Sequence, residues 1–279
     1  MKTGTLSKAA RYVVVTLMGL ILMYPLLWLI SSSFKPDNVI FQNMSLLPRP
    51  FTLENYAIGW RGLTGIPFTT YYVNTFFLIA MVIIGNIITC SMAAFAFARL
   101  QFTLRNLWFA IMLGTIMLPY HVVLIPQYIL FNELNWVNTY LPLIVPKFLA
   151  TDAFFIFLMV QFIRGIPKEL DQAAIVDGCN PLQVFVRILF PLLQPALVTT
   201  AIFSFIWTYN DFFSQLIYIS NPEKFTIALG LRMFFDNQGE SAWGAMFAMS
   251  VVSLLPVFIF FVLFQRLIIE GVSTTGLKG

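Results

Sequence analysis

The 279-residue chain contains 59% apolar and 10% charged residues, with thirty phenylalanines and a formal net charge of +4. This balance excludes a soluble globular domain, in which about a quarter of the residues are charged. Because roughly 20 helical residues cross the core of a bilayer, the chain has room for about six spans with short loops. We therefore predict an all-α integral membrane protein with six transmembrane helices.

Long apolar runs define the six predicted spans of what we expect to be a single transmembrane domain over residues 1–279. The first run follows Lys2, Lys8 and Arg11, but it is longer than the core of a cleavable signal and shows no small-residue cleavage site. Between the first two spans, the Pro- and Gly-containing segment 34–70 predicts an extramembrane loop with little regular structure. The predicted spans are residues 12–33, 71–98, 107–124, 142–163, 196–219 and 243–267.

The distribution of basic residues predicts the orientation of these spans. If the N-terminus is cytoplasmic, ten of the sixteen basic residues lie inside, together with only four acidic residues. Because short cytoplasmic loops carry an excess of Lys and Arg, both termini and the polar interval 164–195 are expected in the cytoplasm. The positive charge then reflects topology, and no nucleic-acid partner is predicted. The ten are Lys2, Lys8, Arg11, Arg99, Arg105, Arg164, Lys168, Arg187, Arg266 and Lys278.

Residues able to bind metals or form disulfides are few. Cys90 lies in an apolar run and Cys179 in the polar interval, so packing is the expected role of both. His121, near the outer end of the third span, has no Cys or carboxylate cluster near it in the sequence, and it is read as an interfacial hydrogen-bonding residue. No metal site is predicted.

The fourth predicted span contains a carboxylate at a depth where lipid is expected. A charged side chain inside a membrane is costly, so it normally faces protein or a water-filled path. Asp152 has Lys147 five positions earlier. An ion pair between them is one interpretation, and a polar lining for a hydrophilic substrate is the other.

The polar interval 164–195 predicts a platform of two short helices. Pro167 suits the first position of a helix, and Gly178 can adopt the left-handed conformation that ends it. Asn180, Pro181 and Gln183 then match an N-cap, a first helical position and a capping-box partner. Pro191 and Pro195 are expected to end the second helix. The apolar stripes, which contain Leu170, Ala173 and Ala174 and then Leu182, Phe185, Val186 and Leu189, pack on the membrane domain itself or form a docking surface for another protein.

The fifth predicted span ends in an aromatic and polar cluster formed by Trp207, Tyr209, Asn210 and Asp211. Sugars bind to flat apolar rings and to side chains that hydrogen-bond their hydroxyl groups, and this cluster supplies both. An aromatic belt at the outer membrane interface is the alternative. Asn74, Asn86 and Gln161 are weaker candidates, because amides also join membrane helices to each other.

Several motifs of energy conversion and catalysis are absent from the sequence. We find no GxxxxGK[ST] phosphate loop, no dinucleotide fingerprint and no GxSxG elbow. The chain is therefore not expected to be an enzyme, and any ATP hydrolysis must occur in another subunit. An ion-coupled secondary transporter with Asp152 and Asp211 as ion sites is the rival. Such transporters usually show inverted repeats, broken helices and more than six spans, none of which is visible in the sequence.

The platform resembles the EAA coupling loop of permeases from binding-protein-dependent ABC importers. The family's Glu-Ala-Ala triplet corresponds to Gln172, Ala173 and Ala174, its Asp-Gly to Asp177-Gly178, and its Leu-Pro to Phe190-Pro191. The resemblance implies that these residues enter a cleft on an ATPase subunit. Because an amide replaces the family's carboxylate at Gln172, Asp171 or Glu169 is expected to take over its ionic contact.

Nearly the whole chain is similar to the smaller permease of maltose-type oligosaccharide importers. The resemblance rests also on 23–28, 32–35, Asn55-Tyr56, 93–99, Pro119 and Pro126, 207–212 and 265–271. It implies a bacterial plasma membrane protein that forms a sugar pathway with a second, homologous permease. It also implies two ATPase subunits that bind ATP and Mg²⁺, no cofactor in this chain, and an extracytoplasmic sugar-binding protein. The tail 273–279 is expected between the ATPases, and the loop 220–240 against the binding protein.

Overall fold

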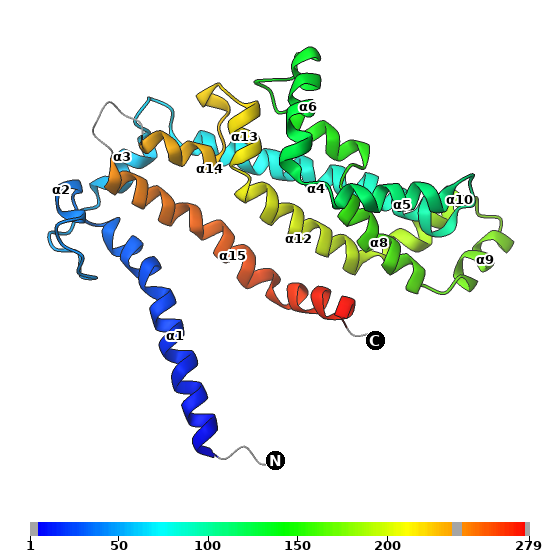
Figure 1. The fold of residues 1–279 in the computed structure, drawn as a ribbon, viewed down its shortest axis with the longest axis horizontal. Helices are drawn as coiled ribbons and strands as arrows, with labels where there is room; N and C mark the ends of the chain where they lie inside the picture. Colours follow the sequence, from blue (N-terminus) through cyan, green and yellow to red (C-terminus); the bar gives the residue numbers. More distant parts are fainter. Residues whose placement is uncertain (1–4, 236–241, 277–279) are drawn as a thin grey trace. The chain divides into compact units, whose positions relative to one another are not determined.

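The protein is helical throughout the part of the chain that the structure describes. The structure is a computed structural model that describes residues 5–235 and 242–276, with side chains for 10–235 and 242–266. Figure 1 shows helices and no strands in these residues. Four helical segments are long and apolar enough to cross a membrane, or up to six if each of two bent helix pairs is one span. The predicted all-α membrane fold is confirmed.

The described residues form two compact units, one within 1–69 and 230–258 and one within 70–229 and 259–279. The helices of eight or more residues are α1 Thr5–Ser32, α3 Glu54–Arg61, α4 Phe68–Arg99, α5 Arg105–Ile116, α6 Tyr120–Glu133, α8 Ala153–Gly165, α9 Glu169–Val176, α12 Gln194–Asn210 and α15 Trp243–Gly276. The shorter pieces are α2 Asp37–Ile40, α7 Leu141–Ile144, η1 Val145–Leu149, α10 Pro181–Val184, η2 Phe185–Leu189, α11 Phe190–Leu192, α13 Phe213–Tyr218, η3 Pro222–Lys224, α14 Ile227–Gly230 and η4 Leu231–Phe234.

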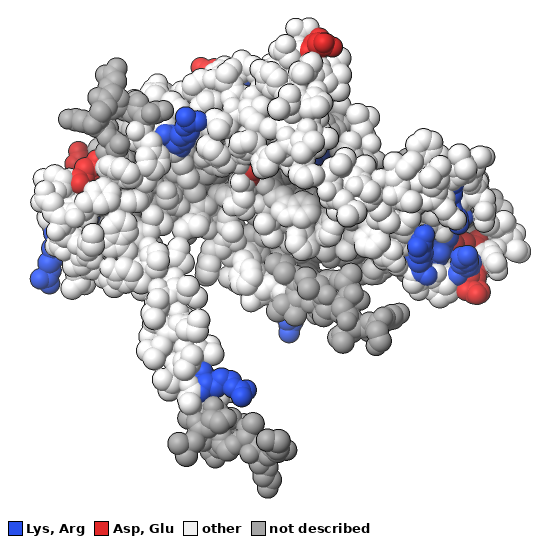
Figure 2. Space-filling model, viewed as in Figure 1, with Lys and Arg blue, Asp and Glu red and all other residues white. Residues whose placement is uncertain are grey.

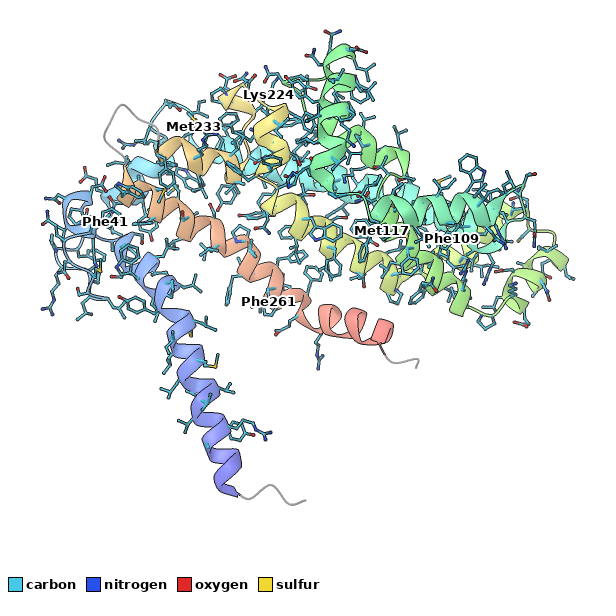
Figure 3. The ribbon with its side chains drawn as sticks, viewed as in Figure 1. Phe41, Phe109, Met117, Lys224, Met233 and Phe261 are labelled. Atoms are coloured by element: carbon cyan, nitrogen blue, oxygen red, sulfur yellow. The ribbon has the colours of Figure 1, made fainter. Side chains whose placement is uncertain are left out.

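The third predicted span is broken in the structure. Four of the predicted spans fall on the candidate spans 10–32, 68–99, 141–165 and 243–266, although the helix of 141–165 is interrupted between η1 and α8. Over 107–124, however, α5 and α6 meet at 102°, and Met117 marks the break in Figure 3. Pro119 has an extended backbone with φ −60° and ψ 130°. Because proline lacks an N–H and disfavours a helical residue before it, α5 cannot continue through this point.

The fifth predicted span, 196–219, is also corrected. Helix α12 ends at Asn210, Asp211 is extended, and α13 starts separately at Phe213. At its other end, α12 follows α10–α11 at a bend of 73°. Pro191 does not end the second platform helix, because the wider π-helical turn η2 precedes it and accommodates its ring. Pro195 lies in the first turn of α12, where its missing N–H costs no hydrogen bond.

In the first unit, the loop 34–70 is more ordered than predicted, because it contains α2 and α3. The Lys35 side chain is fully buried, and its Nζ donates to the carbonyls of Asn43 at 2.9 Å and Ser45 at 2.6 Å. Burial lowers the pKa of this ammonium group. Asn55 Nδ2 donates to the carbonyls of Ser33 and Lys35 at 2.9 and 2.8 Å. In this loop, side-chain donors thus satisfy backbone carbonyls that the hydrogen bonds of a helix or sheet would otherwise satisfy.

The start of α15 packs closely against this loop, in the same unit. The Gly244 N–H donates to Asp37 Oδ1 at 2.7 Å. A Cβ atom at Gly244 would lie 2.5 Å from Asn55 Oδ1, so only glycine permits this approach. Around it, the Trp243 ring meets Phe41 edge-on at 5.2 Å. Asn55 thus has a structural function in the loop 34–70.

The core of the second unit joins the membrane helices to the platform. Helix α8 packs against α5 and α12 (Figure 1). Phe155, Met159 and Ile163 on α8 are fully buried, as are Cys90 on α4 and Leu189 in the platform. Cys179 packs against the same cluster, so the predicted packing role of both cysteines is confirmed. The platform is therefore anchored to the membrane domain by a continuous apolar core.

Candidate functional site

Two helix breaks in the second unit border one cavity. Asp152 lies between η1 and α8, where Ala150 is left-handed with φ 54°. Asp211 lies between α12 and α13. Both residues line a cavity of about 820 Å³, within the usual size range of ligand sites. Backbone that is not helical is tolerated at membrane depth where it lines such a cavity, which favours a hydrophilic path here.

At the first break, Asp152 and Lys147 form the predicted ion pair. Lys147 Nζ lies 2.8 Å from Asp152 Oδ1 and 3.0 Å from Oδ2. The residues are five apart, and the turn at Ala150 allows their side chains to meet. Both side chains also line the cavity, and 30% of the Lys147 side chain and 21% of the Asp152 side chain are exposed. The predicted ion pair is therefore present, and the same two side chains also line the cavity.

Trp207 forms the flat apolar wall of the cavity. Its ring stacks on Phe155 at 5.1 Å and 26°, and Phe154 and Phe203 lie 5.5 and 5.7 Å from it. These contacts hold the ring in place, while 46% of the residue stays exposed. The exposed part of a fixed indole ring is suited to stacking with the apolar face of a sugar ring.

Polar groups lie next to Trp207 in the same cavity. Asn210 Nδ2 donates to its own helix at the Ile206 carbonyl (2.8 Å), which leaves the amide oxygen as an acceptor. Asp211 Oδ1 accepts from the Ser214 N–H at 3.0 Å and so caps the start of α13. The Ser214 hydroxyl is hydrogen-bonded to the Tyr120 hydroxyl at 2.9 Å. The cavity thus combines an aromatic wall with hydroxyl, amide and carboxylate groups.

Tyr209 does not belong to this cavity, although it was predicted with its neighbours. It is 7% exposed and stacks on Phe205 at 5.7 Å. Helical residues are spaced by about 100°, so Tyr209 points nearly opposite to Trp207, whereas Asn210 and Asp211 return to the same side. The 100° spacing of helical residues could therefore have predicted from the sequence that Tyr209 faces away from Trp207.

The cavity also includes residues that the sequence did not assign to a pathway. Tyr120, His121 and Gln127 come from α6, and Ser214 comes from α13. The His121 ring packs edge-on against Phe213 at 5.1 Å. Pro119 was the sequence signal that could have predicted these residues. A helix break at Pro119 turns the residues that follow it, including those of α6, away from the direction of α5. No group of three or more metal-binding side chains occurs in the described residues.

The weaker amide candidates lie elsewhere. Asn74 Nδ2 donates to the carbonyls of Glu223 and Phe225 at 2.8 and 2.9 Å. Asn86 Nδ2 donates to Ser204 Oγ at 3.0 Å, which joins α4 to α12. These two residues therefore connect parts of the protein, and Gln161, exposed on α8, does not line the cavity.

The platform has the two-helix form that its sequence predicts. Gly178 has φ +85° and follows α9. The Asn180 N–H donates to Gln183 Oε1 and the Gln183 N–H to Asn180 Oδ1, both at 2.9 Å, so the capping box is present. Contrary to the prediction, Pro167 is not the first residue of this helix, because α9 begins two residues later at Glu169. The turn between the helices is thereby fixed by local hydrogen bonds.

The apolar stripes of the platform divide between two faces. Ala174, Phe185 and Leu189 are buried against the membrane helices. The outer face of the platform carries large exposed apolar side chains. Their exposed fractions are 43% for Leu170, 59% for Ile175, 86% for Val176, 61% for Leu182 and 53% for Val186. One face of the platform therefore packs on the membrane domain, as one interpretation predicts, and the other face is exposed.

Among the residues predicted to contact an ATPase, Asp171 already has a partner. Its carboxylate forms an ion pair with the Arg99 guanidinium at the end of α4, and the two side chains are only 13% and 7% exposed. The same guanidinium donates to the Ile166 carbonyl at 2.8 Å. Glu169, Gln172, Ala173, Asp177 and Gly178 are all exposed, and Ala174 is buried. Asp171 therefore attaches α9 to α4 and is not free to replace the family's glutamate.

Two other predicted surfaces are only partly described. The loop 220–240 contains η3, α14 and η4, but residues 236–241 lie outside the described part of the chain. The backbone of residues 273–276 forms the end of α15, while the rest of the tail, 277–279, also lies outside it.

Comparison with known proteins places this geometry in a family. Residues 85–273 match the family described as "binding-protein-dependent transport system inner membrane component". The chain is 33% identical to the probable ABC transporter permease protein YurM of Bacillus subtilis, over 92% of this chain and 84% of that protein. It is 31% identical to the trehalose/maltose transport system permease protein MalG of Thermococcus litoralis, over the full length of both.

A solved structure has the same fold. It is the crystal structure of a bacterial ABC transporter involved in the import of the acidic polysaccharide alginate. The TM-score is 0.85 at 21% identity, with 95% of this chain and 98% of that chain covered. The resemblance seen in the platform is confirmed by the family match over two thirds of the sequence. This chain is an inner-membrane permease of the binding-protein-dependent ABC transporter family, whose named relatives include sugar permeases.

Proposed function

We propose that this permease forms, with a second homologous permease, the pathway by which an ABC importer moves a sugar or oligosaccharide into the cell. An extracytoplasmic binding protein delivers the substrate, and two separate ATPase subunits, which bind ATP and Mg²⁺, drive transport. The platform faces the cytoplasm, as do both termini. The single observation that carries the proposal is the exposed apolar face of the platform, on a chain that has no nucleotide-binding motif of its own.

The exposed face of the platform is suited to binding a protein. Ile175, Val176, Leu182 and Val186 place apolar side chains at the surface of a segment whose other face is already packed. A contiguous apolar patch on the water-exposed part of a protein is a marker of an interface. Gln172, Ala173, Asp177 and Gly178 are exposed in the same loop. They fall at positions of the coupling motif that the sequence resembles, with Gln172 in place of its glutamate.

The cavity supports the choice of a saccharide. The fixed Trp207 ring, the Asn210 amide oxygen and the Tyr120 and Ser214 hydroxyls offer stacking and hydrogen bonds in one space. Relatives named for trehalose, maltose and arabinooligosaccharides support the same class. Because the platform follows α8 and leads into α12, a motion of the docked ATPases moves the helices that carry the cavity wall.

A direct test is whether an ATPase subunit stays with the permease through purification in detergent. We expect the wild-type complex to retain it. Val176→Ser changes the most exposed of the large apolar side chains on the platform. It should reduce retention severalfold, because a well-packed apolar side chain contributes roughly 1 kcal/mol or more to an interface. Subunit ratios after affinity purification give the measurement.

Val73→Ser is the matched control for this experiment. Val73 is 63% exposed and lies near the start of α4, at the opposite end of that helix from Arg99 and the platform. Its substitution should leave the ATPase ratio unchanged. Equal ratios for wild type and both variants, or purification of the permease with no ATPase at all, would argue against the proposed docking surface.

The cavity residues are tested by transport kinetics. We expect Trp207→Ala to reduce sugar uptake roughly tenfold, because loss of a stacking wall removes about 1.4 kcal/mol. Asn210→Ala and Asp211→Ala should also impair uptake without loss of protein from the membrane. Initial uptake rates at several substrate concentrations, normalised to the amount of permease in the membrane, measure these effects.

Two further variants separate substrate contact from structure. Asp211→Asn keeps an oxygen that can accept the Ser214 N–H but removes the charge, so retained uptake in this variant assigns the role of Asp211 to capping α13. Tyr209→Phe, outside the cavity, should leave the substrate concentration for half-maximal uptake unchanged. Unaltered kinetics in the Trp207, Asn210 and Asp211 variants together would exclude the cavity as the pathway.

A further inference from the structure

A second pocket lies in the same unit, between the end of α4, the start of α5 and the turn from α8 to α9. Its volume is about 300 Å³. Phe97 and Ala98 form its apolar side, and Gln101 adds an amide. Four basic side chains complete the wall, namely Arg99, Arg105, Arg164 and Lys168. Figure 2 shows basic side chains gathered in the region of α5 and α9, with acidic ones beside them.

Most of this positive charge is not neutralised within the protein. Arg99 is paired with Asp171. Arg105 donates to the Leu100 carbonyl at 3.1 Å, and Arg164 lies over the Phe109 ring, labelled in Figure 3, at 5.2 Å from its centre. Among the described side chains, Arg105, Arg164 and Lys168 have no ion pair with a carboxylate. Three cations therefore converge on a small pocket without acidic partners.

The sequence bias that orients membrane proteins does not require this convergence. The positive-inside rule needs basic residues in short loops, and it is satisfied by side chains that point separately into water. Here the cations come from three separate elements and share one concave site. Such an arrangement fits a compact anion, because several charge-assisted hydrogen bonds can reach it at once.

The surface beside the pocket is apolar and faces outward. On α5 and the residue before it, Leu104, Leu107, Trp108 and Ile111 are 59%, 51%, 54% and 49% exposed. Their spacing of three and four residues places them on one face of the helix. Tryptophan is typical of the membrane interface, and a lipid chain can lie along this face while its headgroup reaches the pocket. A free phosphate ion would make no use of these residues.

We propose that this pocket binds the phosphate of an anionic phospholipid from the cytoplasmic leaflet, with the acyl chains along the exposed face of α5. Arg105, Arg164 and Lys168 contact the phosphate oxygens, and Phe97 with Ala98 contacts the glycerol. This site is next to the platform, and its cytoplasmic position rests on the orientation proposed above. Binding itself depends only on the pocket, so it can be measured separately from transport.

The test is native mass spectrometry of the purified permease complex in neutral detergent, titrated with phosphatidylglycerol. Phosphatidylcholine with the same chains and inorganic phosphate are the comparison ligands. We expect the double variant Arg105→Gln/Lys168→Gln to weaken phosphatidylglycerol binding about 25-fold, or about fivefold for each charge removed. Phosphatidylcholine binding should not change, and inorganic phosphate at millimolar concentration should not displace the lipid.

The control is Arg187→Gln/Arg266→Gln, which removes two exposed basic residues on the same predicted side but outside the pocket. Equal loss of phosphatidylglycerol binding in both double variants would overturn the site, because it would show a general charge effect. Displacement by inorganic phosphate would assign the pocket to the free ion. Normal lipid binding with loss of the ATPase from the pocket variant would assign it to protein docking.

Discussion

Gly178→Asp is expected to abolish the stimulation of ATP hydrolysis by substrate while leaving membrane insertion intact. Gly178 is left-handed with φ +85° and exposed in the turn between the platform helices, and a Cβ atom there would contact nothing within 4 Å. The new side chain therefore meets solvent in the free permease, and in the complex proposed above it would meet an ATPase subunit. The measurement is hydrolysis by the reconstituted complex with and without the substrate-loaded binding protein, where we expect the ratio to fall to about one.

Backbone strain needs its own control at this position. A residue with a Cβ costs about 1 to 2 kcal/mol in the left-handed region, but asparagine tolerates it. Gly178→Asn thus tests the added volume without the charge, and Gly165→Asp adds the same charge at another open glycine, outside the turn. If Gly178→Asp retains normal stimulated hydrolysis, the turn does not enter a cleft on the ATPase.

Arg99→Met is expected to detach the first platform helix from α4. It removes one partner of an ion pair whose side chains are only 7% and 13% exposed, and it leaves the Asp171 carboxylate buried without a counterion. Such a loss costs about 3 to 5 kcal/mol. We expect a lower unfolding temperature and weak coupling of hydrolysis to transport. Thermal unfolding in detergent and the uptake-to-hydrolysis ratio are the two measurements.

The double variant Arg99→Met/Asp171→Leu removes both charges. It shows whether the loss of stability in the single variant comes from the unpaired Asp171 carboxylate. Stability should recover in large part, because no uncompensated charge remains. Arg187→Met, at an exposed position of the platform, should change the unfolding temperature little. If the single Arg99 variant unfolds at the wild-type temperature, the ion pair does not hold α9 in place.

The platform could be predicted closely because its structure depends on neighbouring residues. Asn180 and Gln183 form their capping box across three positions, and Gly178 fulfils the requirement of a single φ angle. Such short-range rules operate in any protein context. The sequence could not assign the stripes to faces, because burial of Ala174 and Leu189 depends on contacts with distant helices.

The helix breaks are the largest difference between the predicted and the observed fold, and they bear on the mechanism. Hydropathy cannot distinguish a straight apolar helix from two bent ones, so Pro119 and Asp211 were placed inside continuous spans. The lack of broken helices had been used against an ion-coupled transporter with Asp152 and Asp211. The structure contains such breaks at both residues. The match to the binding-protein-dependent transport family, and not the absence of helix breaks, therefore distinguishes this permease from an ion-coupled transporter.

The cavity was predicted in part. Trp207, Asn210, Asp211 and Asp152 do line one space, although they are far apart in sequence. Their meeting depends on tertiary packing, which the sequence indicates only through the cost of charges in lipid. Tyr120, His121 and Gln127 were missed because they reach the cavity only through the bend between α5 and α6.

The bend of 73° between α10–α11 and α12 joins the platform to the helix that carries Trp207. Leu193 at the corner is fully buried, its N–H donates to the Leu189 carbonyl at 2.8 Å, and its carbonyl accepts from the Leu197 N–H at 3.0 Å. Because hydrogen bonds continue on both sides of this corner, we expect the two helical segments to move together. The 17 residues of α12 form an arm about 26 Å long. A rotation of α10–α11 by about ten degrees, on the order of a domain motion, would move the Trp207 end of α12 by roughly 4 Å.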